Sequence, residues 1–375
     1  MDKPLSGLKV LELARILAGP WAGQLLADLG AEVLKVERPG VGDDTRHWGP
    51  PFAADGAAAY FHACNRGKQS VAIDLEAPEG QEQVRALAAE ADVLIENFKV
   101  GGLARYGLDY QSLSRLNSGL VYCSITGFGQ TGPYAQRAGY DFIIQGMGGA
   151  MSLTGEPDGA PQKSGIAYAD IFTGLYATVA ILAALRERDR SGRGAHLDMA
   201  LLDTQVSVLA NQALNWMVSG KVPHRMGNGH ANLVPYQAFT VADGEVIVAV
   251  GNDRQFERLC RILGLPELAA DERFRTNPGR VVNRNGLIPV LEQAMRDRSL
   301  HEFSEALEAA GIPSGPINDV GAVFADRQVV HRGLRIEGEI PGLASPIVID
   351  GSRQTADRPA PSLDGDRDDI LGPSC

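Results

Sequence analysis

The chain has 375 residues, of which 44% are hydrophobic and 22% charged, so it can bury a sizeable core and has the length of two or three domains. Its net charge of -11 repels a polyanion, which argues against nucleic acid as a partner and requires a local basic site for any anionic ligand. The four cysteines (Cys64, Cys123, Cys260 and Cys375) form no CxxC pair, and no apolar run marks a signal peptide or a membrane span. We therefore expect a cytoplasmic protein without disulfides or a metal site.

Short runs rich in Val, Ile and Leu alternate with helical segments in the first third of the chain. The apolar runs read LKVLELA, EVLKVE, SVAIDL, DVLIENF and LVYCSIT, and helices are expected at 20–30 and 78–91. Strands separated by helices are typical of βαβ units. The pattern therefore predicts an α/β fold with a mainly parallel sheet.

The rest of the chain divides into a long apolar helix, a second domain and a return segment. The helix follows Asp170 and ends in basic residues, so it should lie in a core or an interface. A Gly-, Pro- and Asn-rich stretch predicts a boundary between a large domain over 1–217 and a smaller α+β domain over 218–318, with a hairpin turn at Asp243–Gly244 and two or three helices. The segment 311–319 should cross back in extended form to the large domain, which 319–375 completes with a loose tail after Pro359.

A GxGxxG pattern, Gly127, Gly129 and Gly132, follows LVYCSIT directly, as in a dinucleotide-binding turn. Such a site also needs a helix that opens within the motif and an acidic residue that closes the next strand. Here Pro133 and a polar stretch follow, and the next apolar segment has no acidic end. We interpret the glycines as a backbone turn and disfavour a nicotinamide or flavin site.

Asp170 stands where a flexible stretch, SGIAYAD, meets the long apolar helix. One interpretation is an N-cap, because aspartate is among the best capping residues. The other is a nucleophile. Helix-end N–H groups should lower the pKa of a carboxylate, and an ionised carboxylate beside an apolar wall can attack a thioester. The two interpretations are compatible.

No other residues form a known catalytic motif. GxSxG and HExxH are absent, His196 is interpreted as a hydrogen-bonded core residue, and only His224 and His230 remain as possible site neighbours. Parallel sheets bind ligands at the carboxyl ends of their strands. Arg15, Arg38 and Asn97 all follow such ends, so together they predict an anion site.

These segments also resemble a known family. The similarity lies in LKVLELARILAGPWAGQLLADLGAEVLKVERPGVGDDTR, NRGKQSVAIDL, DVLIENF, SITGFGQTGPYAQRAGYD, the Asp170 segment and GIPSGPIND. Their order and spacing, over nearly the whole chain, resemble the family III coenzyme A-transferases and their racemase relatives. The resemblance implies a Rossmann-like large domain built from both chain ends, a small domain between them, and two ring-shaped subunits interlocked as a homodimer. It also implies an active site at the domain and subunit interface.

The resemblance implies roles for particular residues. Asp170 matches the nucleophilic aspartate, which carries an acyl group and then coenzyme A. Tyr140 and Asp141 match residues beside the reacting thioester, and Gly227 and Gly229 belong to the remnant of a glycine loop. The residues matched to coenzyme A contacts are Arg15, Arg38, Lys68, Asn97, Phe98, Arg105 and Arg137.

Three functions are compared on this basis. The motifs are most similar to the succinyl-CoA–glutarate group, so we expect transfer from succinyl-CoA to a C4–C6 dicarboxylate, with no cofactor beyond coenzyme A. Leu17 replaces the glutamine of formyl-transferring members, which disfavours formate or oxalate. A 2-methylacyl-CoA racemase is disfavoured because AGYD places a phenol, with an ordinary pKa of about 10, where the racemases carry histidine. A non-catalytic CoA-binding protein is disfavoured by the intact Asp170.

Overall fold

The computed structural model describes residues 3–372. The chain divides into two compact units, which are described separately. The first contains Met1–Ala150, Lys163–Ala210 and Arg327–Cys375, and the second contains Met151–Gln162 and Asn211–Asp326. The longer segment of the second unit thus covers 211–326, compared with the 218–318 expected from the sequence, and the unit also includes the separate segment Met151–Gln162. The earlier start has a local reason, because Asn211 and Asn215 hydrogen-bond to Asn232 at 3.0 and 3.1 Å.

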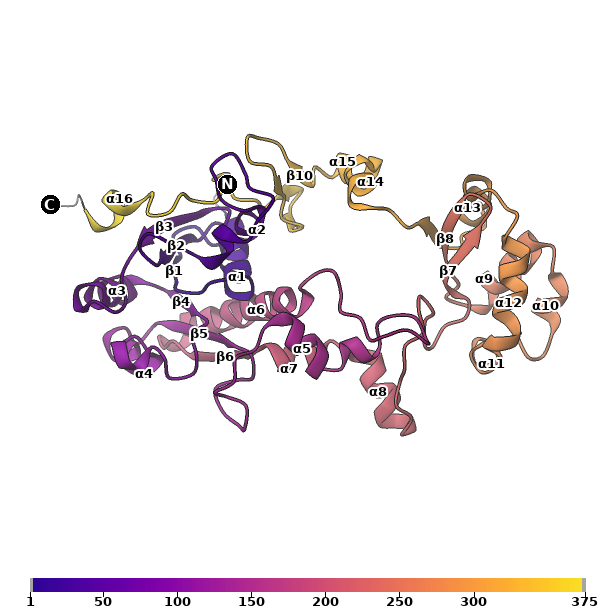
Figure 1. The fold of residues 1–375 in the computed structure, drawn as a ribbon, viewed down its shortest axis with the longest axis horizontal. Helices are drawn as coiled ribbons and strands as arrows, with labels where there is room; N and C mark the ends of the chain where they lie inside the picture. Colours follow the sequence, from indigo (N-terminus) through magenta and orange to yellow (C-terminus); the bar gives the residue numbers. More distant parts are fainter. Residues whose placement is uncertain (1–2, 373–375) are drawn as a thin grey trace. The chain divides into compact units, whose positions relative to one another are not determined.

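A six-stranded sheet, parallel throughout, forms the centre of the first unit (Figure 1). The strand order is β3-β2-β1-β4-β5-β6, which is the order of dinucleotide-binding folds. This confirms the predicted α/β class and its parallel sheet. In such sheets ligands bind where the strand order reverses, which here is the crevice beyond the carboxyl ends of β1 and β4. The strands are β1 (Lys9–Glu12), β2 (Glu32–Glu37), β3 (Lys68–Ala72), β4 (Val93–Glu96), β5 (Val121–Thr126) and β6 (His196–Ala200).

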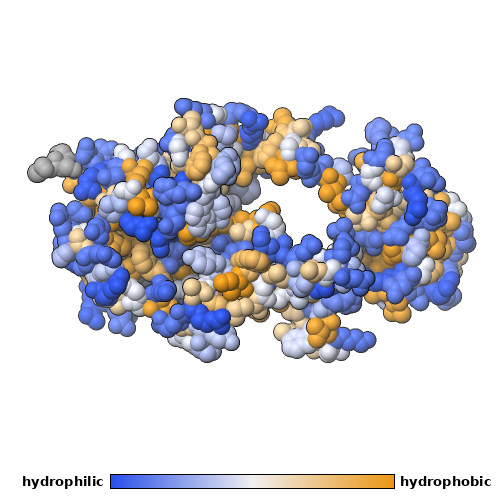
Figure 2. All heavy atoms as spheres, in the orientation of Figure 1, coloured by the Kyte–Doolittle hydropathy of each residue, from blue (hydrophilic) through white to orange (hydrophobic). Residues whose placement is uncertain are grey.

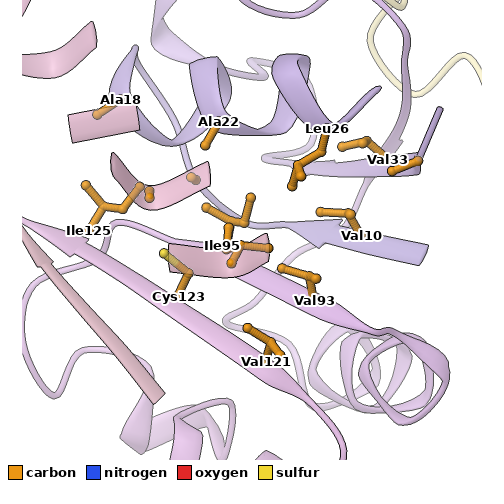
Figure 3. Close-up of a cluster of buried hydrophobic side chains, with 14 of the residues drawn as sticks. Val10, Ala18, Ala22, Leu26, Val33, Val93, Ile95, Val121, Cys123 and Ile125 are labelled. Atoms are coloured by element: carbon orange, nitrogen blue, oxygen red, sulfur yellow. The ribbon is translucent and has the colours of Figure 1, made fainter. Parts of the chain in front are cut away.

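Helices cover both faces of this sheet. Alternate strand residues point to opposite faces, so one face packs on α1 (Ala18–Asp28) and α6 (Tyr168–Ser191) and the other on α3 (Pro78–Glu90) and α4 (Tyr110–Leu116). Figure 3 shows the first of these cores, where Ala22 and Leu26 of α1 meet Val10, Val33 and Ile95 of the strands. The predicted helices at 20–30 and 78–91 are confirmed as α1 and α3.

The close crossing of α1 and α6 depends on Gly174. A Cβ atom at this position would lie 2.6 Å from the Ala18 carbonyl oxygen, so only glycine lets the two backbones approach this closely. The 24-residue α6 is long and apolar enough to cross a membrane by length and composition, contrary to the expectation that no segment is. Core helices of soluble proteins share that pattern, and α6 packs on α1 and on the sheet.

The second unit is an α+β unit with an antiparallel sheet. The predicted hairpin is confirmed as β7 (Tyr236–Val241) and β8 (Gly244–Ala249). The segment 311–319 is extended as predicted, but β9 (Ser314–Pro316) pairs with β8 as the third strand of this sheet instead of crossing to the first unit. Five helices occur where two or three were expected, partly because Gly264 ends one helix with φ +75° and Pro266 begins the next. They are α9 (Asp253–Leu263), α10 (Pro266–Ala270), α11 (Asn277–Val282), α12 (Arg284–Met295) and α13 (Leu300–Ala309).

The C-terminal segment is anchored, so the expectation of a loose tail after Pro359 is wrong. The Ser70 N–H of β3 donates to Asp366 Oδ2 at 2.9 Å, and the Asp366 N–H donates to the Ser70 carbonyl at 3.1 Å. Because β3 is an edge strand, its outer backbone groups need partners, and the tail supplies them. A short helix, α16 (Arg367–Leu371), follows.

The remaining elements are short. The helices are α2 (Ala59–His62), α5 (Asp141–Met147), α7 (Leu201–Ser207), α8 (Ala210–Ser219), α14 (Val320–Ala325) and α15 (Arg327–His331), with 3-10 turns at Asp44–His47, Ala104–Tyr106 and Ala150–Ser152. The strands are β10 (Arg335–Ile336), β11 (Gly342–Leu343), β12 (Val348–Ile349) and β13 (Ser352–Arg353). Two of these helices, α2 and α5, carry residues of the site described below.

Candidate active site

A cleft of about 580 Å³ opens at the carboxyl ends of β1 to β4, within the first unit. Three guanidinium groups and several apolar side chains line it, together with three carboxylates, of which Glu37 already pairs with Arg46. That combination suits a phosphorylated ligand with an aromatic or aliphatic body. The lining residues are Leu13, Arg15, Val36, Glu37, Arg38, Pro39, Ile73, Asp74, Leu75, Glu76, Phe98, Arg105 and Tyr106. Four of the seven residues matched to coenzyme A contacts, Arg15, Arg38, Phe98 and Arg105, are therefore brought together here.

Asp44, which sequence reasoning missed, holds two of these guanidinium groups. Its carboxylate lies 2.8 Å from Arg15 Nη1 and 3.4 Å from Arg38 Nη2. Asn97 does not line the cleft but fixes the loop after β1: its Oδ1 accepts from the Arg15 N–H at 2.9 Å, and its Nδ2 donates to the Arg15 carbonyl at 2.6 Å. The side chain of Asn97 thus acts through Arg15.

Two other predicted contacts lie elsewhere. Lys68 is fully enclosed, because its Nζ donates to Glu12 Oε1, the Pro20 carbonyl and Asn65 Oδ1 at 2.8–2.9 Å. The prediction that Lys68 contacts the nucleotide is therefore not supported by its position. Arg137 lies on the loop after β5, over the rings of Phe128 and Tyr134, and is not part of the cleft wall.

Lys68 belongs to a buried ionic cluster beneath the cleft. Glu12 pairs with both Lys68 and Lys35, and Lys35 also pairs with Asp43 at 2.9 Å. Burial disfavours charge on Asp43, but the Lys35 ammonium and hydrogen bonds from Thr45 outweigh it and lower the Asp43 pKa to about 2. Asp43 also accepts from the Ile16 N–H, which joins this cluster to the loop that carries Arg15.

Asp170 is the third residue of α6, not its N-cap. The N-cap position is Ala167, which has no side-chain cap. Asp141 of α5 provides the missing acceptor: its Oδ1 accepts the N–H groups of Ala169 and Asp170 at 2.9 and 3.4 Å. The N-cap interpretation of Asp170 is therefore wrong. Because Asp141 takes up those N–H groups, the Asp170 carboxylate remains available for chemistry.

Burial raises the pKa of Asp170 to about 7, and the negative charge of Asp141 adds to the shift. The expectation that the Asp170 pKa would be lowered is therefore wrong. Burial disfavours the charged carboxylate, and the helix-end N–H groups that could have stabilised it already donate to Asp141. Tyr60 of α2, also missed from the sequence, lies nearby: burial raises its pKa to about 12, and Asp170 contributes to that shift. A phenol that keeps its proton can donate a hydrogen bond beside the carboxylate.

The glycine-rich loop is a backbone turn, as predicted. Gly127 has no room for a side chain, because a Cβ atom there would lie 2.6 Å from Gly139 Cα, and Gly129 and Gly132 have φ values of +87° and +92°. The Gly127–Gly139 approach fixes the segment that precedes α5. Tyr140 is 60% exposed at the start of that helix, directly before Asp141.

The other candidates do not join this group within the first unit. Gly227 and Gly229, with His224 and His230, belong to the second unit, so their place beside a thioester stays a prediction. The Nε2 atom of His196, at the start of β6, lies 2.9 Å from Ser124 Oγ, which confirms the predicted hydrogen bond. The side chain is exposed, so the prediction that it lies in the core is wrong. Among residues 3–372, Cys64, Cys123 and Cys260 are buried and unpaired, and no three metal-ligating side chains gather; Cys375 lies outside the described residues.

A parallel α/β unit with an arginine-lined cleft and a carboxylate of near-neutral pKa is the class of structure expected for an enzyme that reacts with a phosphorylated cosubstrate. The model of CoA-transferase family III matches residues 5–367, and the chain belongs to that family. It is 55% identical to a succinate–glutarate CoA-transferase of Agrobacterium fabrum, over 96% of this chain and 93% of the relative.

Two further similarities agree with that membership. The chain is 45% identical to the human succinyl-CoA:glutarate CoA-transferase, over 90% of this chain and 77% of the relative. A crystal structure of a CaiB/BaiF family protein from Brucella suis superimposes with a TM-score of 0.88 at 57% identity and covers 99% of both chains. The resemblance found in the motifs is therefore confirmed, and the protein is a CoA-transferase.

Proposed function

We propose that this enzyme transfers coenzyme A from succinyl-CoA to glutarate or a similar C4–C6 dicarboxylate, through Asp170. The observation that carries the mechanism is a partly buried carboxylate of raised pKa, freed from helix capping by Asp141, in the unit that holds the arginine-lined cleft. The names of the Agrobacterium and human relatives support the choice of substrates. A screen with succinyl-CoA as donor and a panel of mono- and dicarboxylates as acceptors tests it.

The reaction needs only carboxylates and a thiol. Ionised Asp170 attacks the thioester carbonyl, the C–S bond breaks, and a mixed anhydride and CoA thiolate form. The thiolate then attacks the aspartyl carbonyl, which releases succinate and leaves an aspartyl-CoA thioester. The acceptor carboxylate reverses the two steps and departs as its CoA thioester. Coenzyme A is the only cosubstrate proposed, and water must be kept from the anhydride.

Replacement of the cleft arginines should weaken binding more than chemistry. Arg38→Ala and Arg105→Ala each remove a guanidinium from the cleft wall, and a phosphate contact acts equally on ground and transition states. We expect the KM for succinyl-CoA to rise about 10-fold or more, as loss of a charge-assisted hydrogen bond of roughly 1.5–3 kcal/mol predicts, with kcat nearly unchanged. Steady-state kinetics measure both values. A fall in kcat at constant KM would contradict this placement of the phosphates.

We also propose that two copies associate as the interlocked homodimer that the family resemblance implies. Apolar side chains are exposed on neighbouring surfaces of α5 and α6, with Phe142 and Val179 57% and 62% exposed. Figure 2 shows apolar residues interrupting the hydrophilic surface in the region where Figure 1 draws these helices. Exposed apolar side chains of this kind are typical of a subunit interface, and a second copy would cover them. A cytoplasmic location is part of the same proposal.

Tyr140 separates the transferase from a racemase. A racemase exchanges the α-proton of its thioester, whereas a transferase does not. We expect no rapid α-deuteration of a 2-methylacyl-CoA in deuterated water, together with formation of glutaryl-CoA from succinyl-CoA and glutarate. Tyr140→Phe should keep roughly a tenth to a half of the transferase activity, since it removes one neutral hydrogen bond of about 0.5–1.5 kcal/mol. Fast deuteration that vanishes in Tyr140→Phe, without acyl transfer to any acid, would favour the racemase.

A further inference from the structure

We propose that Gln145 is a positioning residue for the nucleophile: its side-chain amide fastens the segment that leads into Asp170 to the helix that carries Asp141. The proposal rests on the proposed function of Asp170. Gln145 lies on α5, one helical turn after Asp141, and is 1% exposed. Gln145 does not line the cleft, and its hydrogen bonds go to Asp141, Ile166 and Ser164, so it acts on Asp170 through these groups.

Both ends of the Gln145 amide are engaged. Its Nε2 donates to Asp141 Oδ2 at 2.6 Å and lies 3.5 Å from the Ile166 carbonyl, while its Oε1 accepts from the Ser164 N–H at 2.9 Å. The other oxygen of Asp141 accepts the N–H groups of Ala169 and Asp170. One buried amide therefore fixes the orientation of the Asp141 carboxylate and holds the backbone of 164–166 beside it.

This geometry matters because the Asp170 carboxylate reacts twice, first through an oxygen and then at its own carbonyl carbon. The Asp170 carboxylate attacks the thioester, and its own carbonyl is then attacked by the thiolate, so its direction must persist through both steps. A rotation of Asp141 would release the first N–H groups of α6, and the Asp170 carboxylate could then turn back to cap its own helix. Gln145 opposes that rotation, because only a side chain with both a donor and an acceptor makes the two bonds together.

The test uses two substitutions of similar size. Gln145→Met keeps the volume and removes both hydrogen bonds. We expect kcat to fall about 10- to 100-fold, as a misplacement of ~1 Å does, with the KM for succinyl-CoA within about twofold of the wild-type value. Hydrogen exchange at the Ala169 and Asp170 amides should accelerate about 10-fold or more in the same variant, because their acceptor is no longer held.

Gln145→Glu gives a pH-dependent readout that a loss of packing would not give. The introduced carboxyl donates to Asp141 when protonated and repels it when ionised. The ratio of variant to wild-type kcat should therefore rise as the pH falls from about 8 to about 5.5, and forming the ratio removes the pH dependence that the two proteins share. A flat ratio contradicts the proposal even if Gln145→Met fails to fold.

Gln24→Met is the matched control. Gln24 is a buried glutamine of α1 whose amide also joins two backbone groups, the Ala63 carbonyl and the Arg66 N–H, away from α5. Its replacement should lower stability without faster exchange at Ala169 and Asp170. Unchanged exchange and a kcat above half of wild type in Gln145→Met would overturn the proposal, as would faster exchange in both variants. A wild-type protein that transfers CoA to no acid refutes the proposed function, while the exchange comparison still decides whether Gln145 holds the segment.

Discussion

Asp170→Asn is expected to abolish CoA transfer and, at pH 8, to make the protein more stable than the wild type. Asparagine keeps the shape but cannot form the anhydride or the aspartyl-CoA thioester, so we expect turnover to fall at least about 10³-fold, as when a nucleophile is removed. Coenzyme A should still bind, because the cleft is lined by other residues. The thioester adduct, detected by mass spectrometry after incubation with succinyl-CoA, should form in the wild type alone.

The gain in stability follows from the raised pKa. Asp170 has a pKa of about 7 in the folded protein, whereas an unfolded aspartate has a pKa of about 3.9. Below about pH 4 both states hold the proton, and the carboxyl costs nothing relative to asparagine. Between pH 4 and 7 the unfolded state ionises first, so the wild type loses stability as the pH rises. Above pH 7 the penalty is constant at roughly 2–4 kcal/mol, reduced from the full shift because the side chain is partly exposed.

Denaturant titrations of both proteins at pH 5 and pH 8 measure this difference. The advantage of Asp170→Asn should be larger at pH 8 than at pH 5, and the wild-type kcat/KM should fall as the pH drops below about 7, because only the ionised carboxylate is a nucleophile. If the stability difference between the two proteins were the same at pH 5 and pH 8, the pKa of Asp170 would not be raised by folding. Asp170→Ala controls for any hydrogen bond that the introduced amide forms.

The first unit could be predicted well from the sequence because its signals are local. Runs such as EVLKVE and LVYCSIT are short and rich in Val, Leu and Ile, and helices such as α3 begin at a proline, so strand and helix positions follow from the local sequence. The second unit was predicted less well. Its helices are short, and their number depends on individual breaks such as Gly264 and Pro266.

The site could be predicted only as far as residue types allow. Asp170 stood out at a helix start, but its capping partner, Asp141, lies 29 positions earlier in the sequence, and the burial that sets the sign of its pKa shift is a tertiary property. Lys68 was misplaced for a similar reason: a lysine at a strand start gives no sign of the buried carboxylate that it meets. The available signal was Glu12 and Lys35, charged residues inside otherwise apolar strands.

Glu12→Ala should be the most destabilising single change in the first unit outside the apolar core. Glu12, Lys35 and Lys68 are fully buried, and the Glu12 carboxylate lies 2.8–2.9 Å from both ammonium groups. Alanine leaves Lys68 without a carboxylate partner and Lys35 with only Asp43. Removal of one partner from a buried ion pair destabilises by about 3–5 kcal/mol, because the remaining charge stays out of water.

Lys9→Ala on the same strand is the matched control for this change. Lys9 pairs with Glu90 at 2.9 Å, but both side chains are more than half exposed, and such surface pairs contribute about 0–1 kcal/mol. Urea unfolding of the two variants separates the buried pair from the exposed one. A loss below about 1 kcal/mol for Glu12→Ala would mean that water reaches the cluster.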